Sequence, residues 1–147
     1  FAEIMWGSTL AHNGLLGTGR EEDWASHRIE HQLSAFYDVA HGAGLAVIYP
    51  AWMKYVYKYN INIFMQFAVR VFDVDISLRQ PEDIALEGIS RLEKFFEFMG
   101  LPTRLSHLNI EGKDIDEMSK RAVMFGSLGA IKKLDAEDVK EIYKLAL

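Results

Sequence analysis

The chain has 147 residues, half of them hydrophobic and 25% charged, which is the size and composition of one ordinary globular domain. Aspartate and glutamate (21) outnumber lysine and arginine (16), and the basic residues never cluster beyond pairs, so no nucleic-acid footprint is present. The absence of cysteine excludes disulfide scaffolds, cysteine-ligated zinc and thiol nucleophiles, and it suits a cytoplasmic protein.

The chain opens on Phe1, inside a helical pattern and without an initiator methionine, so we expect it to be a piece of a longer protein. The most apolar stretch, residues 42–53, is about a dozen residues long, against the ~20 needed to cross a bilayer. No basic segment precedes the first apolar residues, as a signal peptide would require. We therefore expect no membrane association.

Hydrophobic spacing predicts helices throughout the chain and no strand of period two. A first helix is expected over about residues 1–16, and a second from its cap at Asp23 to about Tyr37. A break around residues 38–44 should separate the second helix from a long apolar helix that reaches about Tyr59 and is kinked at Pro50.

The remaining helices are marked by their start and stop signals. They are expected over residues 61–72, from Pro81 to the Gly100-Leu101-Pro102 stop, from near Asp114 and from a cap at Asp135. Charges alternate along the last of these, so about the last forty residues are expected to form a solvated face. The sequence thus predicts a single all-α domain.

Three of the five histidines lie in one stretch, at His27, His31 and His41. His27 and His31 are four residues apart, which places them on one helix face, about 40° apart, where they could bind a divalent metal. The simpler alternative is that both are ordinary polar residues of a half-exposed helix. On one unbroken helix His41 would lie about 21 Å from His27, too far to share a metal. A helix that ends before His41 would remove that objection, and Gly42 and Gly44 just beyond favour such a break, with His41 at the start of the next helix.

The segment from His27 to His31 also fits the pattern His-x-x-Glu-His, in which two histidines bind zinc and the glutamate is the general base of a peptidase. That family needs a further acidic ligand downstream, and no candidate has a distinguishing context. The absence of strands also counts against it. A zinc peptidase is therefore a distant alternative.

A more specific resemblance covers residues 24–44, WASHRIEHQLSAFYDVAHGAG. This segment resembles the metal site of the iron-containing, or group III, alcohol dehydrogenases, and among them the NAD(P)H-dependent butanol dehydrogenases. Residues 5–19 and 45–53 on its flanks agree, and weaker similarity reaches Ile142-Tyr143. The resemblance implies a multi-helix domain like the C-terminal helical domain of the dehydroquinate synthase-like fold. Residues 1–147 would be that single metal-binding domain, and the N-terminal nucleotide-binding domain would be missing.

The resemblance also implies roles for the three histidines. His27 and His41 match the two metal ligands of the helical domain, and His31 matches a histidine near the nicotinamide and alcohol that can relay a proton. Spacing alone favours His27 with His31 as the chelating pair, and we follow the family pattern. Two further ligands, an aspartate and a histidine four residues apart, should precede the chain, because Asp38 has no histidine four positions later. Gly14-x-x-Gly17-x-Gly19 follows a helix and is no dinucleotide motif.

The activity implied is the interconversion of primary alcohols and aldehydes by metal-assisted hydride transfer. The metal would be iron or zinc, and NAD(H) or NADP(H) would be bound mainly by the missing domain. The full-length enzyme is expected to be a homodimer, and the chain alone is expected to be inactive. An alternative of another class is a non-catalytic helical interaction domain with incidental histidines, which should purify without stoichiometric metal.

Overall fold

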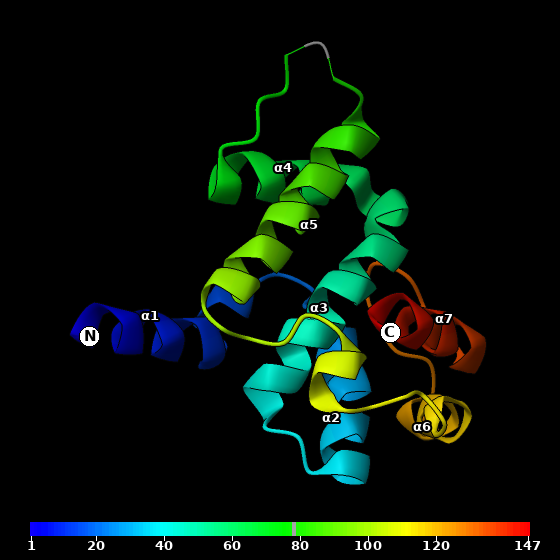
Figure 1. Ribbon diagram of the computed structural model, residues 1–147. Helices are drawn as coiled ribbons and strands as arrows, with labels where there is room; N and C mark the ends of the chain where they lie inside the picture. The colour runs from blue at the N-terminus through cyan, green and yellow to red at the C-terminus, as the bar shows by residue number, and fades with distance from the viewer. Residues whose placement is uncertain (78) are drawn as a thin grey trace.

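The structure is a computed structural model that describes residues 1–77 and 79–147, and it is built from helices (Figure 1). They are α1 (Ala2–His12), α2 (Ala25–Tyr37), α3 (His41–Val56), α4 (Ile61–Phe72), α5 (Pro81–Phe98), α6 (Ile115–Ala122) and α7 (Ala136–Ala146). Within these described residues the β-type pairing is one isolated bridge, between Leu128 and Leu134. The all-α fold predicted from periodicity is therefore confirmed. None of the helices in the described ranges is long and apolar enough to cross a membrane.

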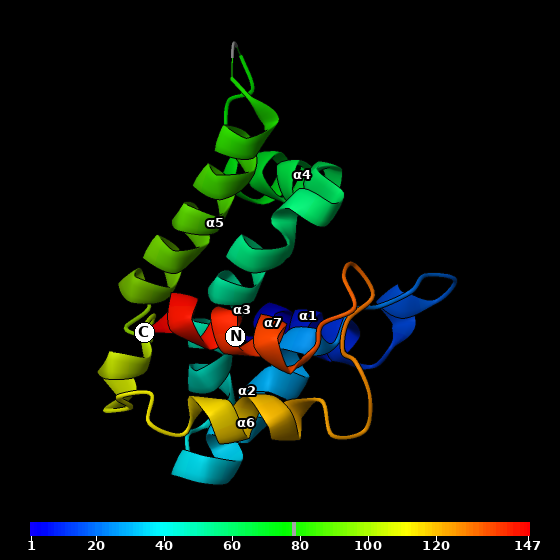
Figure 2. The same cartoon turned by 90° about the vertical axis from the view of Figure 1, so that its right-hand side faces the viewer.

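Helix α3 lies at the centre of the core. Its sequence is apolar around most of its circumference, which is typical of a helix buried on all sides. It contacts α2, α5 and α7, and in Figure 2 α7 crosses in front of α3. The helix continues past Pro50 and ends at Val56, where a 3₁₀ turn (Tyr57–Asn60) replaces the expected continuation to Tyr59.

Two predicted helix starts are confirmed. Pro81 stands in the first turn of α5, where its missing N–H costs no helical bond. Asp135 caps α7 by a reciprocal pair of bonds: its carboxylate accepts from the N–H of Asp138 at 3.0 Å, and the Asp138 carboxylate accepts from the N–H of Asp135 at 3.0 Å. Both signals act locally, which is why the sequence shows them.

The expectation that about the last forty residues form a solvated face is wrong. The α6 and α7 segment places Met118, Val139, Ile142 and Tyr143 in the core with no exposed surface. Each short helix carries one apolar stripe, and α6 and α7 pack these stripes against each other and against α2 and α3. The charges cover only the opposite faces.

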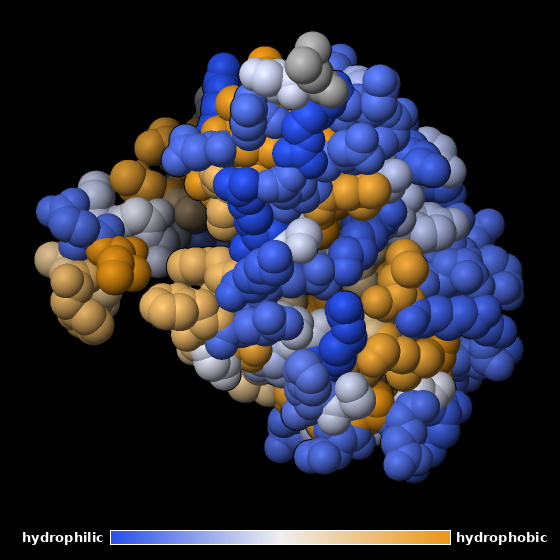
Figure 3. Space-filling view, turned by 45° about the horizontal axis from the view of Figure 1, so that its top comes forward, coloured by the Kyte–Doolittle hydropathy of each residue, from blue (hydrophilic) through white to orange (hydrophobic). Residues whose placement is uncertain are grey.

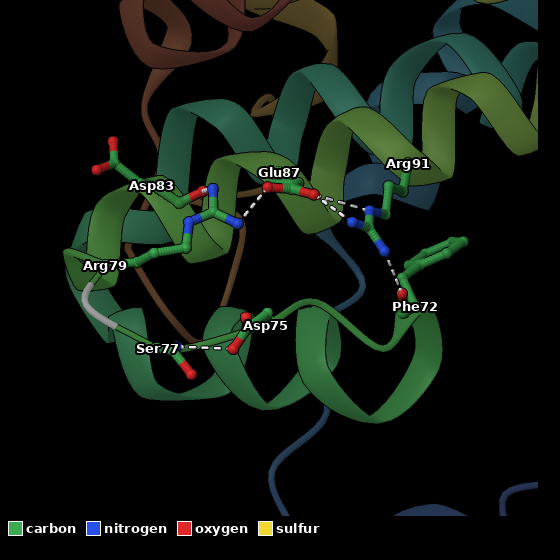
Figure 4. A network of polar contacts seen from close by, with 7 residues as sticks. All are labelled: Phe72, Asp75, Ser77, Arg79, Asp83, Glu87 and Arg91. Carbon is green, nitrogen blue, oxygen red and sulfur yellow. Dashed lines mark hydrogen bonds and ion pairs between the residues drawn. The ribbon is translucent and has the colours of Figure 1, made fainter.

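Helices α4 and α5 cross and pack against each other, and this α4–α5 pair extends from the core (Figure 1). Gly88 allows their close approach, because a Cβ atom there would lie 2.7 Å from the Cα of Ala68. Polar contacts hold the end of the α4–α5 pair (Figure 4): Glu87 pairs with Arg79 and Arg91, and Arg91 donates to the carbonyl of Phe72 at 2.7 Å.

Helix α1 ends at His12, short of the expected residue 16, and a 3₁₀ turn (Leu15–Gly17) follows. It projects from the body of the molecule, and Figure 3 shows apolar surface on this arm. None of its residues is buried, and the side chains of Ile4, Met5 and Trp6 are exposed. An isolated apolar helix of this length is marginal in water. Within the described residues its apolar side chains are therefore left exposed.

Candidate metal centre

Helix α2 ends at Tyr37 and α3 begins at His41, so the predicted break between His27 and His41 is present. It lies within the expected range, before His41, but a different residue makes the turn. The chain turns at Asp38, whose φ of 53° lies in the left-handed region that aspartate tolerates. Gly42 and Gly44, which we expected to make the break, lie in the first turns of α3. One left-handed residue is enough for the turn, and Asp38 supplies it.

This turn brings the three histidines together. The ring of His41, on the first residue of α3, has its centroid 5.4 Å from that of His27 and 5.3 Å from that of His31. His27 and His31 are one turn apart on α2, and His41 lies beside both. His31 and His41 are exposed, while His27 is partly buried. The cluster therefore opens to solvent on one side and contacts the core on the other.

Glu30 lies beneath the cluster and has no exposed surface. One of its carboxylate oxygens contacts Nδ1 of His41, and the other accepts a hydrogen bond of 2.7 Å from the hydroxyl of Ser34. The sequence suggested Glu30 as a peptidase base or as a carboxylate beside the His27–His31 pair, and its pairing with His41 was not predicted. A signal was available: Glu30 occurs beside Ile29 and one turn before Leu33, on the face of α2 that the apolar spacing marks as buried.

His27 carries a polar atom that nothing in the described part of the protein satisfies. Its Nδ1 is buried and has no hydrogen-bond partner there. Its ring packs edge-on against Trp24 at a centroid distance of 4.8 Å. Burial, and after it the nearby imidazoles of His41 and His31, lowers the pKa of His27. His27 is therefore held neutral, which is the form of imidazole that binds metals.

The donor atoms fit a divalent transition metal. Glu30, His31 and His41 each offer one ligand atom within 4.8 Å of the others. This group does not include His27, whose ring centroid lies 5.4 Å from that of His41. Imidazole nitrogen with carboxylate oxygen suits both iron and zinc, so the residues do not select between these metals. An unpaired buried nitrogen costs free energy, and a bound cation would remove that cost.

A cavity of about 430 Å³ opens beside His27. Its wall is largely apolar and includes Leu45, Tyr49, Phe96 and Leu101. Such a volume and lining are typical of sites for small organic molecules. A ligand with an apolar chain and a polar end could place the chain against this wall and the polar end near His27.

The comparisons with known proteins identify the class to which this helical domain belongs. Residues 2–147 match the profile described as "Fe-containing alcohol dehydrogenase family, C-terminal". The chain belongs to that family and corresponds to its C-terminal part. The resemblance seen in residues 24–44 is thereby confirmed.

Curated relatives and solved structures agree with this family. The chain is 42% identical over 144 residues to the "Probable NADH-dependent butanol dehydrogenase 1" of Bacillus subtilis, covering 98% of this chain and 37% of that protein. It is similar in structure to NADH-dependent butanol dehydrogenase A of Thermotoga maritima, with a TM-score of 0.88 and 42% identity over 96% of this chain and 37% of the other. The aldehyde reductase YqhD of Escherichia coli has a TM-score of 0.92 and 30% identity over 99% of this chain and 38% of its own. The chain thus spans little more than a third of these proteins.

Proposed function

We propose that this chain is the metal-binding domain of an NAD(P)-dependent alcohol dehydrogenase that interconverts primary alcohols and aldehydes of butanol-like size. One observation carries the proposal. The ring centroids of His27 and His41 lie 5.4 Å apart across the α2–α3 turn, and His27 has a buried nitrogen without a hydrogen-bond partner in the described residues. The family membership and the butanol dehydrogenases among its relatives support the choice of substrate.

In this proposal His27 and His41 would hold the metal, iron or zinc. A divalent metal supplies Lewis acidity, which lowers the pKa of a coordinated hydroxyl group. The cavity beside His27 takes the alkyl chain of the alcohol, because its apolar wall gains by excluding water. The carbinol carbon is thereby oriented relative to the nicotinamide.

His31 has the proton-transfer role. Oxidation of an alcohol releases a proton as well as a hydride, and the hydride goes to the nicotinamide. The His31 ring is exposed and lies 5.3 Å from that of His41, so it can take the proton at a ring nitrogen and pass it to solvent. In the reduction of an aldehyde the same ring returns the proton.

The rest of the enzyme is also part of the proposal. A nucleotide-binding domain would hold NAD(H) or NADP(H) and contribute an aspartate and a histidine as further ligands. Its contact with α1 would cover the apolar side chains that this helix exposes. The butanol dehydrogenase relative from Bacillus subtilis is named NADH-dependent and the aldehyde reductase YqhD is named NADPH-dependent. The experiment below therefore uses both coenzymes. We propose a cytoplasmic homodimer for the full-length protein.

The test uses the full-length protein. We expect reduction of NAD⁺ or NADP⁺ that depends on 1-butanol, is lost after treatment with a chelator and returns with Fe²⁺ or Zn²⁺. A full-length protein that purifies without stoichiometric metal and reduces neither coenzyme would instead support the interaction domain. Chelator-sensitive peptide cleavage without nicotinamide would support the zinc peptidase. The complete burial of Glu30 argues against that outcome, because a general base must reach a water molecule.

A further inference from the structure

We infer that Glu30 is a positioning residue of the metal centre, which fixes the imidazole of His41 through Nδ1, and that Gly44 provides the space in which it does so. The inference rests on the proposed function, since it assumes that His41 binds a metal. It adds a role for two residues that the family resemblance does not assign. The carrying observation is the contact between a fully buried carboxylate and one ring nitrogen of an exposed histidine.

The contact selects one tautomer of His41. A carboxylate can only accept a hydrogen bond, so Nδ1 of His41 carries the proton that it donates to Glu30. Nε2 is then left with its lone pair, as a metal ligand requires. His41 needs this restraint because its side chain is 46% exposed and stands on the first residue of a helix. A partner on the second ring nitrogen also raises the basicity of the ligand.

Glu30 is itself held from two sides. The hydroxyl of Ser34, one turn along α2, donates to its second oxygen at 2.7 Å. On the other side the carboxylate lies against the backbone of α3 at Gly44. A Cβ atom at residue 44 would lie 2.8 Å from Cγ of Glu30 and 2.9 Å from its Cδ, closer than such atoms approach. Any side chain at residue 44 would displace the carboxylate from His41.

Gly42 provides the matched comparison. It lies two residues earlier in the same helix, and a Cβ atom added there would have no neighbour within 4 Å. Glycine is unfavourable inside a helix. The space around Gly42 does not require glycine, whereas the space around Gly44 does, and the atoms that require it belong to Glu30.

Glu30 could in principle bind the metal directly, since one of its oxygens lies within 4.8 Å of ligand atoms of His31 and His41. Its surroundings favour the indirect role. Both oxygens already have partners, in Ser34 and His41, and the side chain has no exposed surface. The two roles differ in what removal of the charge does: loss of a ligand changes the coordination sphere, whereas loss of an orienting partner weakens binding about 10–100-fold.

The experiment measures metal binding by the full-length protein. Affinities for Zn²⁺ and Co²⁺ are obtained by competition with a chromogenic chelator, and the visible spectrum of the Co²⁺ form reports the ligand set. We expect Glu30→Gln to lower the affinity about 10–100-fold and to keep one metal per chain at saturation, with a Co²⁺ spectrum like that of the wild type. Gly44→Ala should reproduce this loss, and Gly42→Ala should bind as tightly as the wild type.

The double variant Glu30→Gln/Gly44→Ala should bind no more weakly than the weaker single variant, because both changes remove one contact. Wild-type affinity in Glu30→Gln, or in Gly44→Ala, would overturn the inference. So would a Co²⁺ spectrum that changes in Glu30→Gln, since Glu30 would then be a ligand. If the wild-type protein itself binds no metal, the proposed function fails. If the wild type and Glu30→Gln bind metal with equal affinity, the positioning role of Glu30 is wrong and the proposed function still stands.

Discussion

The phenolic hydroxyl of Tyr143, on α7, donates a hydrogen bond of 2.7 Å to the backbone carbonyl of Ile29, on α2. Ile29 stands between His27 and His31, so this bond joins the end of the helical core to the segment that carries the histidines. The Tyr143 ring has no exposed surface, and burial raises the pKa of its hydroxyl, which remains a donor. The packing of α7 therefore sets the position of the candidate site.

Tyr143→Phe tests this link. The ring stays and the hydroxyl is lost, so we expect a cost of about 0.5–1.5 kcal/mol in the free energy of unfolding. Urea denaturation of the purified protein measures it. Tyr59→Phe is the matched control, because its side chain is 58% exposed and a surface change stays within about 0.5 kcal/mol. Equal stability of the two variants would show that the bond contributes nothing.

Asp23 carries a second link of the same kind. One carboxylate oxygen accepts from the N–H of Ala25 at 2.9 Å, at the start of α2. The other accepts from the N–H groups of Ala130 and Ile131 at 2.8 and 3.0 Å. We expect Asp23→Ala to cost about 1–3 kcal/mol, because it leaves these donors without their acceptor.

Hydrogen exchange locates the effect of Asp23→Ala. The amides of Ala25, Ala130 and Ile131 should exchange faster, whereas those of the α4–α5 pair should not change. Asp75→Ala is the control, because its carboxylate accepts from the N–H of Ser77, between α4 and α5 and far from Asp23. Unchanged exchange at Ala130 and Ile131 in Asp23→Ala would exclude the link.

The sequence predicts those features whose causes are local. Helices followed from apolar spacing, and the starts at Pro81 and Asp135 followed from residues that act within one turn. Asp23 was expected to cap α2, and it does bond the N–H of Ala25, although Trp24 occupies the position before the helix. Its bonds to Ala130 and Ile131 could not be predicted, because they join residues more than a hundred positions apart.

The candidate site divides in the same way. The juxtaposition of His27 and His41 depended only on a break between them, and the family resemblance implied it. The break lies within the expected range of residues 38–44, but the residue that makes it was not identified, since Asp38 is a weaker turn signal than the two glycines beyond it. The burial of Glu30 was missed because glutamate is almost never buried without a partner, and its partner His41 lies in another helix.

The 147-residue chain by itself should show no dehydrogenase activity. Under the proposed function it supplies two of the metal ligands and a separate domain binds the dinucleotide, so metal affinity should also be far below that of the full-length protein. Coenzyme reduction with 1-butanol is measured on the purified chain supplied with Zn²⁺ or Fe²⁺. Alcohol-dependent formation of NADH or NADPH would contradict the assignment of coenzyme binding to a separate domain.

The roles of the three histidines are separated by metal analysis and turnover of the full-length enzyme. His27→Ala and His41→Ala should lose bound metal, because each removes a ligand that the remaining ones cannot replace without moving. His31→Ala should keep the metal and lose about 10²–10⁴-fold in turnover, the usual contribution of a positioned general acid–base.

Spacing alone makes the opposite prediction, with His27 and His31 binding the metal and His41 dispensable. The distances between ring centroids do not decide between the two assignments, since the His41 ring lies 5.4 Å from that of His27 and 5.3 Å from that of His31. The burial of His27 and the exposure of His31 favour the first assignment, because a proton relay needs contact with solvent. A metal-free His31→Ala enzyme beside a metal-loaded His41→Ala enzyme would reverse the two roles.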